Sequence, residues 1–426
     1  MKLLTRTAIA LVAALGAAPV AAQYMTPAPA APPQMPRVPD QAQTDHGSTP
    51  VATGAVRPSA KALKPLLALQ KAVDANDAAN IPSLVAAAQA AASTKEDRYL
   101  LARLQLKAAV AANDKAGMAS AVDAIANSGV QSPTEVGQLY MGLGSTYYNT
   151  KQFDLAAAAF QKGSAIDPNN ADILLNLGEA RFAQGHPAEA VAAFQRVIQI
   201  KTAAGQKPDE KLFRRALSIA YDAKLPSAID ISRAWVAAYP SPESWHNTIA
   251  VYRNGSHQDL EGTLDLLRLM QAAGALTSPA DYVMFVESAA EQNNFTEAQA
   301  VVDAGIAAKV INPSSPEFRD IVAGVRAKQK ASAAELAEAT KSATTGVALM
   351  RIGERYYGMG EYAKAADLFR QAKAKGGVDN DLANLHLGMA LARAGDKAGA
   401  TAALNGVTGA RADIAKLWVA YLQQKA

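Results

Sequence analysis

The sequence predicts an all-α fold in which pairs of helices stack side by side along the chain. One observation behind this prediction is a pattern of small and bulky residues that recurs 34 positions apart, at Gly144 and Gly178. The other is composition. Hydrophobic residues make up 50% of the 426 residues and many are Ala, which has the highest helix propensity. Because a lone helix pair leaves an apolar face uncovered, each pair must stack on its neighbour.

The pattern is clearest between residues 137 and 204, which hold two copies of it. In each copy a Gly lies on one face of the first helix, and an Ala and a Phe lie four residues apart on the second helix. The small residues let two helix backbones approach, and the aromatic residues fill the remaining volume. The residues are Leu143, Gly144, Tyr147, Ala156, Phe160 and Pro168 in the first copy, and Leu177, Gly178, Ala190 and Phe194 in the second.

The same spacing recurs elsewhere in the chain. Residues 346–426 are expected to form two further strong repeats, whereas residues 60–136 and 205–345 are expected to form degenerate helical hairpins. The spacing of the anchor residues predicts about ten helix pairs from residue 60 to the end. The residues of the two C-terminal copies are Gly353, Tyr356, Ala365 and Phe369, then Gly388 and Ala400.

This period and pattern resemble the tetratricopeptide repeat, W-x₂-L-G-x₂-Y followed by A-x₃-F and P. Tyr140 stands where that family usually has Trp. The resemblance implies two antiparallel helices per repeat, stacked into an α-solenoid that is a right-handed superhelix. It also implies a concave face that usually binds a polypeptide, without naming the partner.

The first 22 residues have the pattern of a secretory signal peptide. Lys2 and Arg6 precede an apolar run over residues 8–18, and small residues follow at 20–22, where a signal peptidase cuts. An uncleaved anchor is the alternative, although the run is too short to span a bilayer. We therefore expect an exported protein, periplasmic in a Gram-negative bacterium, with secretion as the alternative.

Residues 23–59 differ in composition from the rest of the chain. They are rich in Pro and Ala and contain few large apolar residues, which is typical of an extended, disordered linker. The alternative is a Pro-x-x-Pro ligand at Pro29–Pro32 or Pro36–Pro39. We expect a tether.

Charge and cysteine content exclude several classes of function. The chain has no Cys, which excludes disulfides, thiolate metal sites and lipid attachment at a cysteine. The formal charge is +4, and without Lys2 and Arg6 the balance is 40 basic against 38 acidic residues, too even to indicate nucleic acid. No later run is long and apolar enough to predict a transmembrane helix in the mature chain.

The resemblance also implies where a partner would bind. The groove of this family is lined by first-helix residues that face away from the second helix, and the alternative is that these residues pack on the neighbouring repeat. The family's carboxylate clamp of Lys and Asn is absent, because Met141, Ser145, Leu175 and Glu179 stand at the matching positions. The implied groove residues are Met141, Ser145, Tyr148, Glu179, Phe182, Met350, Glu354, Tyr357 and Met389.

No catalytic, cofactor-binding or metal-binding residue is predicted. No two of the five His residues lie within five positions of each other, so no helical metal pair exists, and the common hydrolase motifs are absent. Asp259, Glu261 and Asp265 form an acidic cluster, which we expect to be a solvated face.

The sequence therefore predicts a non-catalytic protein-binding scaffold of the bacterial cell envelope, which binds a polypeptide partner. One alternative is a structural component that self-associates end to end. The other is an enzyme whose site lies within residues 205–345, where the repeat pattern is weakest.

Overall fold

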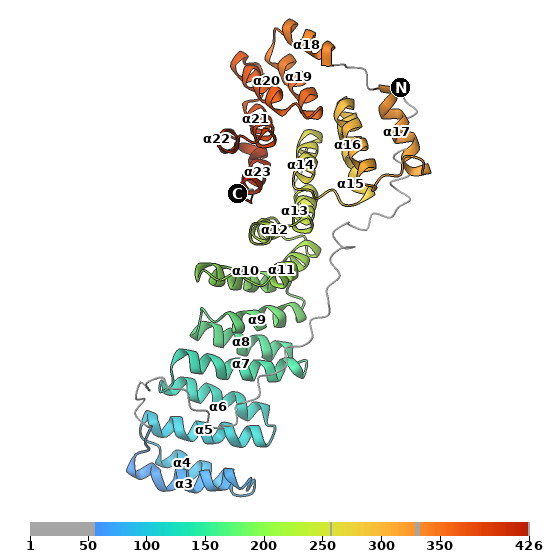
Figure 1. Ribbon diagram of the computed structural model, residues 1–426. Coiled ribbons are helices and arrows are strands. Elements are labelled where there is room, and N and C mark those ends of the chain that lie inside the picture. Colours follow the sequence, from blue (N-terminus) through green and yellow to red (C-terminus); the bar gives the residue numbers. More distant parts are fainter. Residues whose placement is uncertain (1–55, 256–257, 329–332, 425–426) are drawn as a thin grey trace, which may run out of the picture. The chain divides into compact units, whose positions relative to one another are not determined.

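The computed structural model describes residues 56–255, 258–328 and 333–424. Within these ranges it contains 21 α-helices, one 3-10 helix and no strand (Figure 1). The prediction of an all-α fold of stacked helical hairpins is confirmed. No helix among these residues combines the length and the hydropathy needed to cross a membrane. The predicted signal peptide and nearly all of the predicted linker lie outside the described residues.

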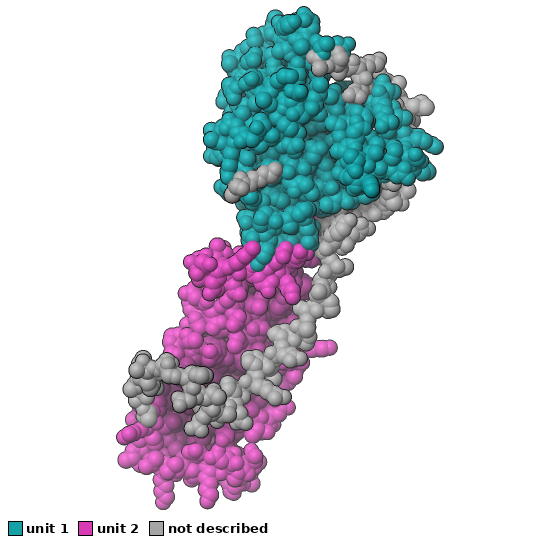
Figure 2. Space-filling view, in the orientation of Figure 1, with its two compact units in different colours: residues 1–26, 226–426 teal, residues 27–225 magenta. Residues whose placement is uncertain are grey.

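The chain divides into two compact units at the junction of Leu225 and Pro226, and Figure 2 colours them separately. The described part of unit 2 is residues 56–225, and that of unit 1 is residues 226–255, 258–328 and 333–424. This boundary falls inside the predicted degenerate segment, and the finer divisions expected at residues 136, 204 and 345 stay predictions.

Unit 2 is a run of helices that pack in chain order, each mainly on the helices before and after it. Its helix starts follow from local sequence: Ser132 and Thr94 cap two of them with capping boxes, and Asp114 and Asn170 cap two others. The helices are α3 (Ala60–Asp74), α4 (Ile81–Ala91), α5 (Lys95–Ala111), α6 (Lys115–Ser128), α7 (Pro133–Asn149), α8 (Phe153–Ile166), α9 (Ala171–Ala183), α10 (Pro187–Ala203) and α11 (Glu210–Asp222).

Unit 1 begins with helix pairs of the same kind but does not keep to chain order. The helix α19 packs on α16 as well as on its own partner α20, and the last helix packs on α12, α14 and α21. The elements are α12 (Ser227–Ala238), α13 (Pro242–Gly255), α14 (Leu260–Ala272), α15 (Pro279–Glu291), α16 (Phe295–Ala307), α17 (Pro316–Lys328), α18 (Ala333–Ser342), α19 (Gly346–Gly358), α20 (Tyr362–Lys375), α21 (Asn380–Ala394), α22 (Lys397–Asn405), η1 (Gly409–Arg411) and α23 (Ala412–Gln424).

The C-terminal helix α23 packs on helices of unit 1 that are distant from it in sequence. Trp418 and Tyr421 are buried, with their ring centroids 5.7 Å apart in an edge-on arrangement. The Tyr421 hydroxyl donates a 2.9 Å hydrogen bond to the carbonyl of Ala272. The Gln424 amide donates to the carbonyl of Val236 and accepts from the indole of Trp245. Unit 1 therefore has a closed core in which α23 contacts both its early and its late helices.

The glycines of the repeat pattern lie where two helices cross closely. A Cβ atom added to Gly144 would lie 2.5 Å from the Phe160 ring, and one added to Gly178 would lie 2.5 Å from Phe194. The same contact occurs in unit 1, where a Cβ on Gly353 would lie 2.6 Å from the ring of Phe369. These phenylalanines are at most 1% exposed, so the rings have little room to move away.

Replacing Gly144 by Ala should destabilise unit 2 by about 1–3 kcal/mol, because the added methyl group overpacks the contact with Phe160. The matched control is Gly142→Ala on the same helix, where a Cβ would meet nothing within 4 Å; this change should be neutral or stabilising by about 0.5–1 kcal/mol. Urea unfolding followed by far-UV circular dichroism measures both. Equal effects of the two substitutions would contradict the close-approach explanation.

Asp97 joins the first helix pair of unit 2 to the second. Its carboxylate accepts hydrogen bonds from the Ser59 backbone amide (2.7 Å) and hydroxyl (2.8 Å), and from the amides of Ser93 (3.0 Å) and Thr94 (3.1 Å). Burial raises the pKa of Asp97, but the amides of Ser93, Ser59 and Thr94 favour the charged form and hold the pKa well below its usual value. The ionised side chain therefore stabilises the start of both α3 and α5.

The stabilisation from Asp97 should disappear in acid. A carboxylate whose pKa falls on folding contributes its full stability above the pKa of an unfolded Asp, about 3.9, and loses it as the pH falls further. The Asp97→Asn variant should unfold at lower urea than the parent near neutral pH, and the difference should shrink below about pH 4. Far-UV circular dichroism measures the two midpoints as a function of pH. A difference independent of pH would show that Asp97 does not act through its charge.

Candidate functional site

Five of the nine expected groove residues lie on two neighbouring first helices of unit 2. Met141, Ser145 and Tyr148 lie on α7, and Glu179 and Phe182 lie on α9. The first four are half-buried and Phe182 is 40% exposed. The structure thus leaves part of each side chain accessible, which is compatible both with a binding surface and with packing between repeats.

Contacts join this surface to the next first helix, α11. The guanidinium of Arg215 on α11 makes two hydrogen bonds to the Glu179 carboxylate, at 3.2 and 3.0 Å. It also lies 4.4 Å from the centroid of the Phe182 ring, a cation–π distance. Tyr148 packs edge-on against Phe153 with the ring centroids 5.3 Å apart. We call Tyr148, Glu179, Phe182 and Arg215 the aromatic–arginine surface.

The four expected groove residues of unit 1 are placed differently. Met350, Tyr357 and Met389 are 6%, 6% and 1% exposed, so the structure does not present them on an open surface. Tyr357 faces the side chain of Arg268 from α14, with the guanidinium 5.0 Å from the ring centroid. The groove interpretation needs correction here, because α14 and α16 cover the faces of α19 and α21 that repeat phase alone leaves free.

Buried charges replace a groove in unit 1. Arg268 is 2% exposed and makes two 2.8 Å hydrogen bonds to the Glu297 carboxylate on α16. Its third contact is a 3.0 Å hydrogen bond to Asp265, one turn earlier on α14. The Asn294 amide donates to Glu297 at 2.6 Å. Each member is thus paired, as burying an ion requires.

The network continues to α21 and α19 through a histidine. The His386 ring is 1% exposed, and its Nε2 lies 3.2 Å from the Asp265 carboxylate. Its Nδ1 lies 3.2 Å from the carboxylate of Glu354, the fourth expected groove residue of unit 1. Glu261, one turn before Asp265 on α14, lies beside them and pairs with Arg411 of η1 at 3.1 Å. We call Glu261, Asp265, Arg268, Glu297, Glu354 and His386 the buried ion cluster.

The charged side chains of the buried ion cluster lie close together and shift one another's pKa values. Burial lowers the pKa of His386, but the carboxylates of Asp265 and Glu354 raise it to about 10. Burial raises the pKa of Glu261, and the neighbouring carboxylates of Glu354 and Asp265 raise it further against the opposing charges of His386 and Arg411. Carboxylates therefore outnumber the cations that hold them.

The expectation of a solvated acidic face at residues 259–265 was wrong for Asp265, which is fully buried, and right for Asp259, which is exposed. Sequence reasoning also missed the cluster as a whole, because His386 and Asp265 are 121 positions apart. One local signal was present: Asp265 and Arg268 interrupt the apolar run from Leu264 to Met270. Two charges in such a run indicate a buried ion pair.

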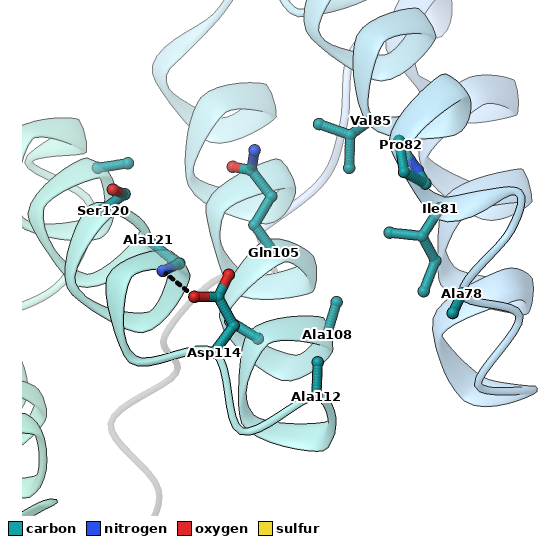
Figure 3. Close-up of a pocket in the computed structure, with 13 residues that line it drawn as sticks. Ala78, Ile81, Pro82, Val85, Gln105, Ala108, Ala112, Asp114, Ser120 and Ala121 are labelled. Carbon is teal, nitrogen blue, oxygen red and sulfur yellow. Dashed lines mark hydrogen bonds between the residues drawn. The ribbon is translucent and has the colours of Figure 1, made fainter.

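A hollow of about 500 Å³ lies between α4, α5 and α6 of unit 2 (Figure 3). Ala side chains make up much of its wall, with Gln105, Asp114 and Ser120 as the polar lining residues labelled in the figure. The Asp114 carboxylate already accepts a 3.0 Å hydrogen bond from the Gly117 amide at the start of α6. The hollow therefore offers little that would orient a ligand.

Comparison with known families identifies the repeats. A TPR repeat model matches residues 144–185, and two tetratricopeptide repeat models match residues 172–200 and 350–413. Residues 144–200 and 350–413 are therefore identified as tetratricopeptide repeats. Both matched regions contain strong copies of the pattern found in the sequence, and the repeats of this family generally act as protein–protein interaction scaffolds. No curated protein matches the chain in sequence.

Solved structures similar to this chain are distant from it in sequence. One is a tetratricopeptide repeat protein from Parabacteroides merdae, with 13% identity, 60% of this chain and 98% of that chain covered, and a TM-score of 0.27. Another is pilF from Pseudomonas aeruginosa, with 12% identity, 62% and 97% coverage and a TM-score of 0.23. The apo quorum sensor NprR from B. thuringiensis has 12% identity, 73% and 97% coverage and a TM-score of 0.23.

Removing the arginine of the buried ion cluster should destabilise unit 1 strongly. Arg268→Met leaves Asp265 and Glu297 buried without their cation, which should cost about 3–5 kcal/mol. The matched control is Arg370→Met, since the exposed pair of Arg370 with Asp367 should contribute less than about 1 kcal/mol. All three tryptophans lie in unit 1, so Trp fluorescence during urea unfolding reports on this unit. A similar loss of stability in both variants would contradict the burial of the Arg268 ion pairs.

Proposed function

We propose that this chain is a non-catalytic scaffold that binds a polypeptide on the aromatic–arginine surface of unit 2. The observation that carries the proposal is the contact of Arg215 with both Glu179 and Phe182, because it joins first helices of successive repeats into one continuous surface. Family membership supports a scaffold without catalysis. Family membership does not identify the partner or the face that binds it, and both are part of this proposal.

The chemistry of the surface suits an extended peptide or the apolar face of a helix. Phe182 is 40% exposed and Leu175, two turns earlier on α9, is 39% exposed, so both offer apolar contact area. Tyr148 adds a ring with a polar tip, and aromatic residues and Arg are the groups that most often dominate binding energy. Because Glu179 already holds the Arg215 guanidinium, the cation is fixed in place before a partner arrives.

The proposal also includes the cellular location of the protein. The signal-peptide pattern in residues 1–22 supports export, and the partner is then a protein or peptide of the bacterial cell envelope. Cell fractionation of the native protein, with the first residue of its mature form determined by mass spectrometry, examines this part separately from binding.

Peptides selected from a display library with the full-length protein should bind through the aromatic–arginine surface. The Phe182→Ser and Tyr148→Ser variants should each weaken a selected peptide by about tenfold or more, since each removes an aromatic anchor. The matched control is Leu155→Ser, which replaces a 49% exposed apolar residue on the second helix α8; it should leave the affinity unchanged. Fluorescence anisotropy with labelled peptides measures all three affinities.

The proposal fails if selection yields no peptide, or if the substitutions at Phe182 and Tyr148 leave the affinities of the selected peptides unchanged. Far-UV circular dichroism of each variant checks that the fold is retained. Because both positions are at least partly exposed, neither substitution should unfold unit 2.

A further inference from the structure

Three side chains that could hold a metal ion converge in unit 1, far from the proposed peptide surface in sequence. They are Glu261 on α14, Glu354 on α19 and His386 on α21. One potential ligand atom from each lies within 4.8 Å of the other two. We propose that these residues bind a divalent first-row transition-metal ion, through the Glu261 and Glu354 carboxylates and Nδ1 of His386.

The position of the histidine is the first argument for a metal. The ring is 1% exposed, and its Nδ1 has no hydrogen-bond partner within the described part of the chain. The Glu354 carboxylate lies 3.2 Å from this atom, close enough for an ion pair with the charged ring. Two side-chain atoms that share one ion lie at about this separation when each is about 2.0–2.2 Å from the ion.

The opposite side of the ring provides a second argument. Nε2 of His386 lies 3.2 Å from the Asp265 carboxylate, which Arg268 in turn holds at 3.0 Å. Histidines that ligate metals usually donate their other ring N–H to a carboxylate, which fixes both the tautomer and the ring orientation. Asp265 is therefore a positioning residue for His386, and Arg268 anchors Asp265.

The charge balance favours an added cation. Arg268 pairs with the two carboxylates of Asp265 and Glu297, and Arg411 pairs with those of Asp259 and Glu261. Each arginine thus already faces two negative charges, and the Glu354 carboxylate adds another. A divalent ion that displaces the His386 proton would add one net positive charge and so reduce this excess.

The donor set and its exposure indicate the class of ion. Imidazole with carboxylates suits Zn²⁺ and related transition metals, whose ligand distances are about 2.0–2.2 Å. The side chains of Glu354 and Glu261 are 19% and 30% exposed, so rotation of these two glutamates can close the site around an ion that enters from solvent. Three protein ligands with access to water would leave a coordination position for water or another donor.

Zinc titration of the full-length protein, purified without a polyhistidine tag and treated with a chelator, tests the proposal. Isothermal titration calorimetry should show one Zn²⁺ bound per chain, and bound zinc should raise the unfolding temperature reported by Trp fluorescence. Glu354→Gln and Glu261→Gln keep the side-chain shape and should each weaken binding by about tenfold or more. The matched control is Glu287→Gln, a half-buried carboxylate on α15 of the same unit, which should bind zinc as the parent does.

Two outcomes would overturn the proposal. One is the absence of zinc binding to the folded parent protein, which would make the residues an ion pair only. The other is binding that Glu354→Gln, Glu261→Gln and Glu287→Gln leave equally strong, which would place the ion elsewhere. Asp265→Asn separates positioning from ligation: it should weaken zinc binding while Co²⁺-substituted protein keeps the absorption spectrum of the same ligand set. Neither outcome depends on the peptide-binding proposal for unit 2.

Discussion

The close approach of two helix backbones within each hairpin is the constraint on which the rest of the structure depends. In the hairpins of the strong repeats it places a glycine on one helix against a bulky side chain on the other, as at Gly144 and Phe160. Buried apolar area then stabilises the pair, but each pair still exposes an apolar face and must stack on the next. The recurrence of this contact at Gly178, Gly353 and Gly388 shows that both units are built from the same element.

Local spacing explains why the helical hairpins could be predicted from the sequence. Gly144 and Phe160 are 16 positions apart and lie on adjacent helices, so their relationship repeats with the period and can be recognised in the chain. The closure of unit 1 has no such signature. Gln424 contacts the carbonyl of Val236 across 188 positions, and nothing in the spacing of either residue indicates the other. Periodicity therefore predicted the hairpins, but not the site at which α23 packs.

Contacts between residues that are distant in sequence also limited the prediction of sites. Repeat phase correctly assigned residues to first helices, and at Tyr148 and Phe182 those residues remain accessible. Met350, Tyr357 and Met389 are buried instead, and Arg268 lies in front of the Tyr357 ring. Which way a side chain points is a local property of its helix. What lies opposite depends on contacts far away in the sequence.

A buried ion cluster costs desolvation energy that a set of apolar side chains would not, so its presence in unit 1 calls for an explanation other than stability. Part of the answer is geometric: Arg268 with Asp265 and Glu297 connects α14 to α16, and His386 connects α14 to α19 and α21. Those pairs alone would join the helices without Glu261, which lies beside Glu354 and His386 and pairs with Arg411 of η1. The position of this carboxylate is explained by the proposed cation, for which it is the third potential ligand with Glu354 and His386.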